Sequence, residues 1–100
     1  MKLLLPMDGA NSEESKLTKI NDAKKWAQIT IEDGKLQDIK FSDTQDGFDD
    51  FSEAVVVVDD GEYVWPFIEL SMLVLVAHTQ RYIEDIVEAF IFKELHDLAY

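Results

Sequence analysis

The feature that most constrains the fold is a pair of alternating segments joined by a very short turn. Residues 26–32 alternate, with Ala27, Ile29 and Ile31 on one side and mainly polar side chains on the other. Residues 36–41 alternate in the same way, and only a short Asp33-Gly34 turn separates the two segments. Two alternating segments around an Asp-Gly turn are typical of a β-hairpin. The sequence therefore predicts two antiparallel strands here.

Three continuous apolar segments predict further strands. They cover residues 2–5, 54–58 and 73–77, and short unbroken apolar runs of this kind are typical of strands buried on both faces. A last segment has apolar residues at three- and four-residue steps, which is the pattern of an amphipathic helix. This pattern runs from Tyr82 to Leu98.

The helix boundaries and the connections can also be predicted. Thr79 is the expected N-cap of the last helix. Residues 62–72 are expected to form an irregular helix, because Pro66 has no backbone N–H to donate. The Asp-rich segment 42–53 has room for one helical turn at most.

The order of these elements predicts an α/β fold. Strands separated by helical segments run parallel, whereas the hairpin is antiparallel. We therefore expect a mixed five-stranded sheet with helices on its faces. One hundred residues suit a single domain, 1–100, because a shorter unit would have too small a core.

Charge and composition narrow the classes of function. The net charge is −12, with 21 acidic and 9 basic residues. Such a charge disfavours binding to nucleic acids and anionic membranes and favours binding to a basic protein or a cation. The alternative interpretation is that the charge only keeps the protein soluble. The chain has no cysteine, so it has no disulfide and no thiolate ligand of its own. No apolar segment is long enough for a signal peptide or a membrane span, and we expect a cytoplasmic protein.

Polar residues follow the predicted parallel strands. Asp8 follows the first strand, Asp59 and Asp60 the fourth, and His78 the fifth, while Lys19 lies in a loop nearby. Ligands of open α/β sheets bind at the carboxyl ends of the strands. Carboxylates with one imidazole suit a divalent cation. The alternative interpretation is an ordinary Asp-Asp-Gly turn and an ordinary strand-end histidine.

Exposed aromatic residues suggest a second kind of site. Tyr63, Trp65 and Phe67 alternate around a proline, and such a group either docks a partner or ligand or covers one face of the sheet. Phe92 and Tyr100 point away from the apolar face of the last helix. A protein partner or a second copy in a homodimer would cover them.

Four passages resemble one known family. They are residues 1–9, 29–36, 55–58 with Gly61, and 82–90 with 93–95. In these passages the chain resembles the dinitrogenase iron-molybdenum cofactor biosynthesis family of small NifX/NifB-like domains. The resemblance implies a ribonuclease H-like sheet of five strands. It also implies a protein that binds or carries a metal cluster or its precursors.

The chain departs from the family signature at one informative position. The family has His-Phe-Gly-Arg-Ala where this chain has residues 19–23, so Lys19 replaces the histidine. A protonated amine has no lone pair for iron, and the resemblance therefore implies a divergent member. We take Lys19, Asp59 and Asp60 as candidate cofactor-binding residues, and Asp8 and His78 as candidate metal ligands. The identity of the cofactor is unknown.

The motifs of common enzymes are missing from the sequence. There is no phosphate-binding glycine loop, no Ser/His/Asp arrangement with its motif context, and no pair of histidines spaced on a helix. A nuclease of the ribonuclease H-like kind would need a carboxylate within the first strand, whereas Asp8 follows it. We expect no enzymatic activity. Two functions remain, a carrier of a metallic or anionic cofactor and a protein-interaction module that keeps the fold without a ligand.

Overall fold

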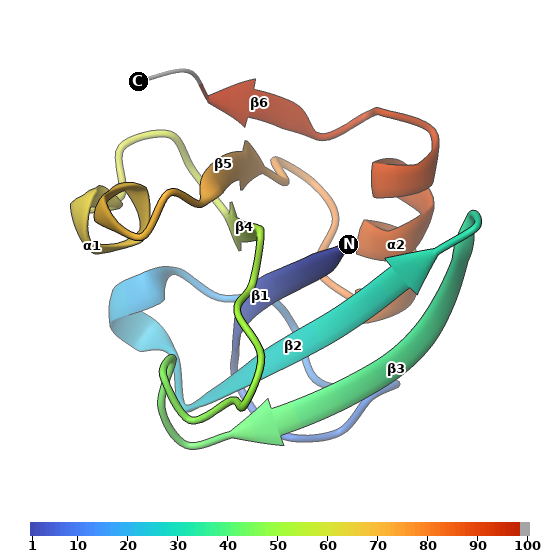
Figure 1. Cartoon of the computed structure of the whole chain (residues 1–100), viewed down its shortest axis with the longest axis horizontal. Helices are drawn as coiled ribbons and strands as arrows, with labels where there is room; N and C mark the ends of the chain where they lie inside the picture. The colour runs from blue at the N-terminus through green and yellow to red at the C-terminus, as the bar shows by residue number, and fades with distance from the viewer. Residues whose placement is uncertain (99–100) are drawn as a thin grey trace.

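A computed structural model describes residues 1–98 and contains one mixed sheet of six strands (Figure 1). The order across the sheet is β3-β2-β1-β4-β5-β6, in which β1, β4 and β5 are parallel and the remaining neighbours are antiparallel. The predicted α/β class is confirmed, but the predicted number of five strands is wrong. The strands are β1 Lys2–Met7, β2 Lys25–Glu32, β3 Lys35–Ser42, β4 Ala54–Val57, β5 Leu73–Val76 and β6 His96–Leu98.

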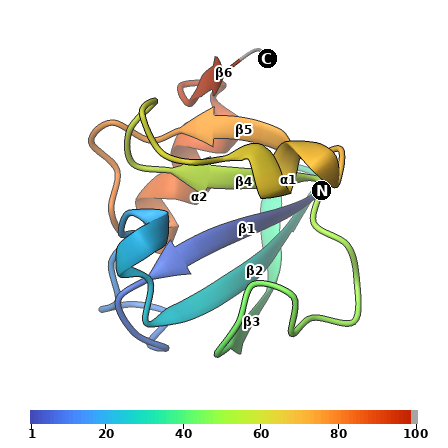
Figure 2. The ribbon, with the colours of Figure 1, turned by 90° about the vertical axis from the view of Figure 1, so that its left-hand side faces the viewer.

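Helices cover the two faces of the sheet. Helix α1, Trp65–Glu69, and helix α2, Ile83–Ile91, lie on opposite sides, and a 3₁₀ turn, η1 Ile20–Asp22, precedes β2 (Figures 1 and 2). Each helix closes a separate apolar cluster against the central strands. No helix within residues 1–98 has the length and apolar character needed to cross a membrane.

The predicted hairpin is confirmed. Strands β2 and β3 pair antiparallel along their length, and both turn residues have positive φ, 54° at Asp33 and 73° at Gly34. The alternation places Ala27 and Ile29 in the cluster under α2. Trp26 points to the other face, where its ring lies 5.9 Å from that of Phe67 in α1.

Strand β1 continues beyond its predicted end and includes Pro6. A proline within a central strand is unusual because it cannot donate a ladder hydrogen bond. Here β4 pairs with β1 only at Leu3 and Leu4, so no bond to β4 is required at Pro6. Its carbonyl still accepts a hydrogen bond from the Thr18 N–H at 2.8 Å.

Pro66 also fits a regular element. Helix α1 begins at Trp65, so Pro66 lies in the first turn, where backbone N–H groups have no partner within the helix. The helix is therefore regular but much shorter than the predicted segment 62–72. It ends at Glu69, and Ser71 turns the chain towards β5 with φ 63°.

The last helix ends earlier than predicted. Helix α2 stops at Ile91, and Lys93 adopts φ 59°. The Glu94 N–H donates to the Ala89 carbonyl at 2.7 Å and the Lys93 N–H to that of Phe90 at 3.1 Å, which together form a Schellman motif. The chain then forms β6, the strand absent from the prediction. At the other end the predicted N-cap, Thr79, is wrong, because Tyr82 occupies that position in extended conformation without a side-chain cap.

The hairpin turn yields a first testable prediction. A Cβ added at Gly34 would meet nothing within 4 Å, so a larger residue there is opposed by backbone conformation alone. We expect Gly34→Val to lower the free energy of unfolding by about 1–2 kcal/mol, measured by urea denaturation. Gly34→Asn is the matched control, since asparagine tolerates positive φ. Its free energy of unfolding should fall clearly less than that of the valine variant. Equal stability of the valine variant and the wild type would contradict a left-handed turn.

Candidate functional site

The carboxyl ends of the parallel strands lie at one edge of the sheet, as expected. Asp8 directly follows β1, while Asp59 and His78 each lie two residues beyond β4 and β5. The 3₁₀ turn η1 sits at this same end, and α1 lies at the opposite one (Figure 2). Residues far apart in sequence therefore lie at the same end of the sheet because of the parallel topology.

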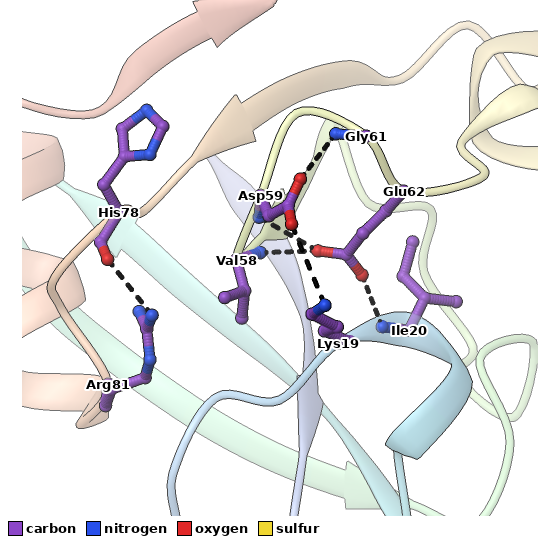
Figure 3. Close-up of polar contacts among 8 residues, drawn as sticks. All are labelled: Lys19, Ile20, Val58, Asp59, Gly61, Glu62, His78 and Arg81. Carbon is purple, nitrogen blue, oxygen red and sulfur yellow. Dashed lines mark hydrogen bonds and ion pairs between the residues drawn. The ribbon is translucent and has the colours of Figure 1, made fainter.

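Glu62 organises the loop after β4. Its Oε2 accepts hydrogen bonds from the N–H groups of Val58 at 2.8 Å and Asp59 at 3.1 Å, and its Oε1 accepts one from Ile20 at 2.6 Å (Figure 3). One carboxylate thus joins the end of β4 to the start of η1. Bonds of backbone N–H groups to an ionised acceptor are stronger than neutral ones. Glu62 is not among the candidate residues predicted from the sequence.

Lys19 and Asp59 form an ion pair beside this junction. The Lys19 Nζ lies 3.8 Å from Asp59 Oδ2, and Asp59 Oδ1 accepts the Gly61 N–H at 2.6 Å (Figure 3). Both side chains of the pair are about half exposed, and exposed pairs of this kind contribute at most about 1 kcal/mol. The pair is therefore weak enough for a ligand to replace one of its members.

A depression of about 300 Å³ opens between η1 and the loop after β4. Lys19, Glu62 and the exposed Tyr63 line this depression. One cation and one exposed aromatic residue, next to the carboxylates of Asp59 and Glu62, suit a small planar or partly anionic group. The remaining lining residues are Ile20, Asn21, Asp59 and Gly61.

His78 is exposed and has another histidine as its neighbour. Its ring centroid lies 6.2 Å from that of His96, which begins β6. The prediction had placed His96 in the last turn of a helix, and the pairing of β6 with β5 instead brings the two imidazoles together. Arg81 holds the chain after β5 by donating to the Ala77 carbonyl at 2.9 Å. It also donates to the His78 carbonyl at 3.1 Å (Figure 3).

The other predicted acidic residues lie apart. Asp8 Oδ1 accepts the Lys16 N–H at 2.7 Å, which closes the loop after β1, and Asp60 is exposed in the turn after β4. Within residues 1–98, no three His, Asp or Glu side chains form a group that could hold a metal ion. The structure thus brings Lys19 to Asp59 but does not gather Asp8, Asp60 and His78 around them.

The three aromatic residues of α1 and its approach differ in exposure. Tyr63 and Trp65 are exposed, in line with the predicted patch, whereas Phe67 is buried in the cluster beneath α1. For Phe67 the alternative interpretation, an aromatic residue that covers one face of the sheet, is confirmed, because the helical turn directs its side chain towards the sheet. Phe92 is exposed as predicted, and Tyr100 lies outside the described residues.

Comparison with known proteins shows a shared fold. The sequence matches no family model and no curated protein. The crystal structure of PH0822 matches with a TM-score of 0.76 at 16% identity, covering 98% of this chain and 96% of that one. A candidate dinitrogenase, MJ0327 of Methanocaldococcus jannaschii, matches with a TM-score of 0.72 at 17% identity, covering 99% and 95%. At these identities the likeness establishes the fold alone.

The bonds to Glu62 yield a second prediction. We expect Glu62→Ala to lower the free energy of unfolding by about 2–3 kcal/mol, because three N–H groups lose a charged acceptor. Glu62→Gln keeps one acceptor oxygen and should lose about half as much. Urea denaturation measures both losses, and faster hydrogen exchange at the Ile20 amide reports the released junction. The control Glu69→Ala removes an exposed carboxylate from α1, and an equal effect of the two alanine variants would contradict the role of Glu62.

Proposed function

We propose that this chain is a small, non-enzymatic binding protein of the cytoplasm that carries a metallic or anionic ligand in the depression beside Lys19. The observation that carries this proposal is the ordered junction at the strand ends. Glu62 fixes the backbone there through three hydrogen bonds, while Lys19 and Tyr63 remain exposed around an open depression. A rigid frame around accessible polar and aromatic groups favours ligand binding over a purely structural role.

The topology supports a more specific version of the proposal. In strands β1 to β5 only β2 runs against the others, in the order β3-β2-β1-β4-β5, which is the arrangement expected of a ribonuclease H-like sheet with β6 added at the edge. The fold is shared with the candidate dinitrogenase MJ0327. We therefore propose a divergent NifX/NifB-like protein whose ligand is related to the iron-molybdenum cofactor or another metal cluster.

The side chains suggest how such a ligand would be held. Lys19 is a protonated amine, so it would contact the anionic part of the ligand by charge and hydrogen bonding and would not coordinate the metal. To make this contact, Lys19 would give up its ion pair with the exposed side chain of Asp59. Imidazole is a ligand for iron and similar metals, and the exposed His78 lies just beyond the end of the neighbouring strand.

Anaerobic binding measurements test this function. We expect the protein to take up iron with sulfide, seen as visible absorption, and Mn²⁺ to broaden amide signals near His78 and Asp59. Lys19→Ala should weaken uptake by about tenfold, the value of one charged hydrogen bond. Lys35→Ala is the matched control, because it removes the same charge at the hairpin turn at the opposite end of the sheet. A colourless protein with unchanged amide spectra would refute the proposal.

A second function, that of a protein-interaction module, is favoured by a different observation. Large apolar side chains are exposed away from the depression, among them Phe51, Leu70 and Phe92. Exposed aromatic residues are enriched at protein interfaces. This function needs no ligand at the strand ends, and one form of it is a homodimer through Phe92.

Sedimentation measurements test the homodimer. Phe92 is 69% exposed at the end of α2, so burying it between two copies would favour association through the hydrophobic effect. We expect wild-type protein to show a concentration-dependent increase in sedimentation coefficient, and Phe92→Glu to remain monomeric. Glu88→Ala, a change of an exposed residue on the same helix, should associate like the wild type. A monomeric wild type at all concentrations would exclude this interface.

A further inference from the structure

A small apolar pocket lies at the end of the sheet opposite the candidate functional site. Its volume is about 120 Å³, close to the roughly 150 Å³ of a cavity that holds one benzene molecule. Helix α1 and the segment leading to β4 meet at this end (Figure 2). The apolar lining residues are Leu4, Phe48, Phe51, Phe67, Leu70 and Met72.

A buried glutamine fixes one wall of this pocket. The side chain of Gln28 is only 3% exposed, and its Nε2 donates to the Asp50 carbonyl and to Ser52 Oγ, each at 2.9 Å. The next residue, Glu53, donates its N–H to the Lys2 carbonyl at 2.8 Å. The backbone is therefore held on both sides of residue 51, so the wall of the pocket is ordered before any partner arrives.

The residue between these anchors is an exposed phenylalanine. Phe51 is 84% exposed, and Leu70 across the pocket is 56% exposed. The bonds from Gln28 to Asp50 and Ser52 hold the chain on both sides of Phe51, so this exposed side chain extends from an ordered segment. Leu73, at the start of β5, is 49% exposed and faces solvent as well. Ordered, exposed apolar side chains around a pocket are the features of an interface centre.

The charges around the pocket are negative. Asp46 and Asp50 line it, and Asp49 lies between them in the sequence. Within residues 1–98, neither Asp46 nor Asp49 forms an ion pair, and Asp50 has only a long contact of 3.8 Å with Lys2. A partner placed here therefore meets uncompensated carboxylates next to an apolar pocket.

We propose that this pocket docks a short segment of a partner protein that combines an apolar side chain with basic residues. The apolar side chain, a leucine, methionine or phenylalanine by size, enters between Phe51 and Leu70. Lysine or arginine residues beside it pair with Asp46 and Asp50. The charge of the pocket rim determines this choice, because opposite charges across an interface speed association and exclude wrong partners.

The same charges disfavour the other occupants. A second copy docked through this same face would bring its own Asp46 and Asp50 against these carboxylates. An anionic lipid surface is repelled for the same reason. The proposal rests on the interaction function given above and is independent of the ligand carried beside Lys19, since that depression lies at the other end of the sheet.

Selection from a library of random linear peptides tests the proposal. The full chain is the bait, and peptides that also bind Leu70→Asp are removed. We expect the enriched peptides to contain a leucine, methionine or phenylalanine next to lysine or arginine. A labelled enriched peptide should bind at least about tenfold more weakly to Leu70→Asp, the size of an interface hot spot. Binding should also weaken several-fold in Asp46→Asn and with rising salt.

Matched controls separate docking from general effects. Leu36→Asp changes an exposed leucine on β3, and Asp85→Asn an exposed carboxylate on α2, and neither should alter peptide binding. Amide spectra establish that each variant folds. The proposal would be overturned if the enriched peptides lacked basic residues. It would also be overturned if no peptide bound the wild type more tightly than Leu70→Asp. Sedimentation showing that Leu70→Asp abolishes self-association would overturn it as well, because a second copy would then be the occupant. The result of this peptide experiment does not depend on whether Lys19→Ala loses ligand binding.

Discussion

The burial of β1 on both faces is the constraint on which the rest of the structure depends. Leu3 and Leu5 face the cluster under α2, while Leu4 faces the cluster under α1, and all three are at most 1% exposed. A central strand of this kind requires a helix on each face. The crossover from β4 through α1 to β5 supplies one and makes β5 parallel to β4, which itself pairs in parallel with β1. The strand carboxyl ends, with the polar depression, are thereby separated from the end that holds the apolar pocket.

The parts of the fold that the sequence predicts correctly are those with local signals. The hairpin follows from alternation and from the Asp33-Gly34 turn, and the strands follow from short apolar runs. The end of α2 has no such signal, because the left-handed residue that stops it is Lys93 and not glycine. Leu95 and Leu98 lie at helical spacing from the preceding apolar residues, yet they belong to the chain around β6. The structure departs from a continued helix through the Schellman motif at Lys93 and the long-range pairing of β6 with β5, and neither has a signal in the apolar spacing.

The candidate site was predictable only in outline. The rule for parallel strands correctly placed Asp59 at the strand ends, and Lys19 lies beside it. A carboxylate after a turn can bond to the preceding amides, so the local part of the Glu62 contact has a signal in the sequence. Its bond to Ile20 spans 42 positions and has none. In the same way the segment that carries Phe51 is held by Gln28, a polar residue inside the hairpin whose partners lie in a distant loop.

The overall negative charge does not decide what each end of the molecule binds. Strand β1 has six residues and spans roughly 20 Å, whereas exposed charges are largely screened beyond about 8 Å at physiological salt. An anion beside Lys19 therefore interacts mainly with the charges of the depression and hardly with the aspartates at the opposite end. A basic segment at the apolar pocket interacts mainly with Asp46 and Asp50. One acidic protein can accordingly hold an anionic ligand at one end and a basic partner at the other, because local arrangement outweighs net charge over this distance.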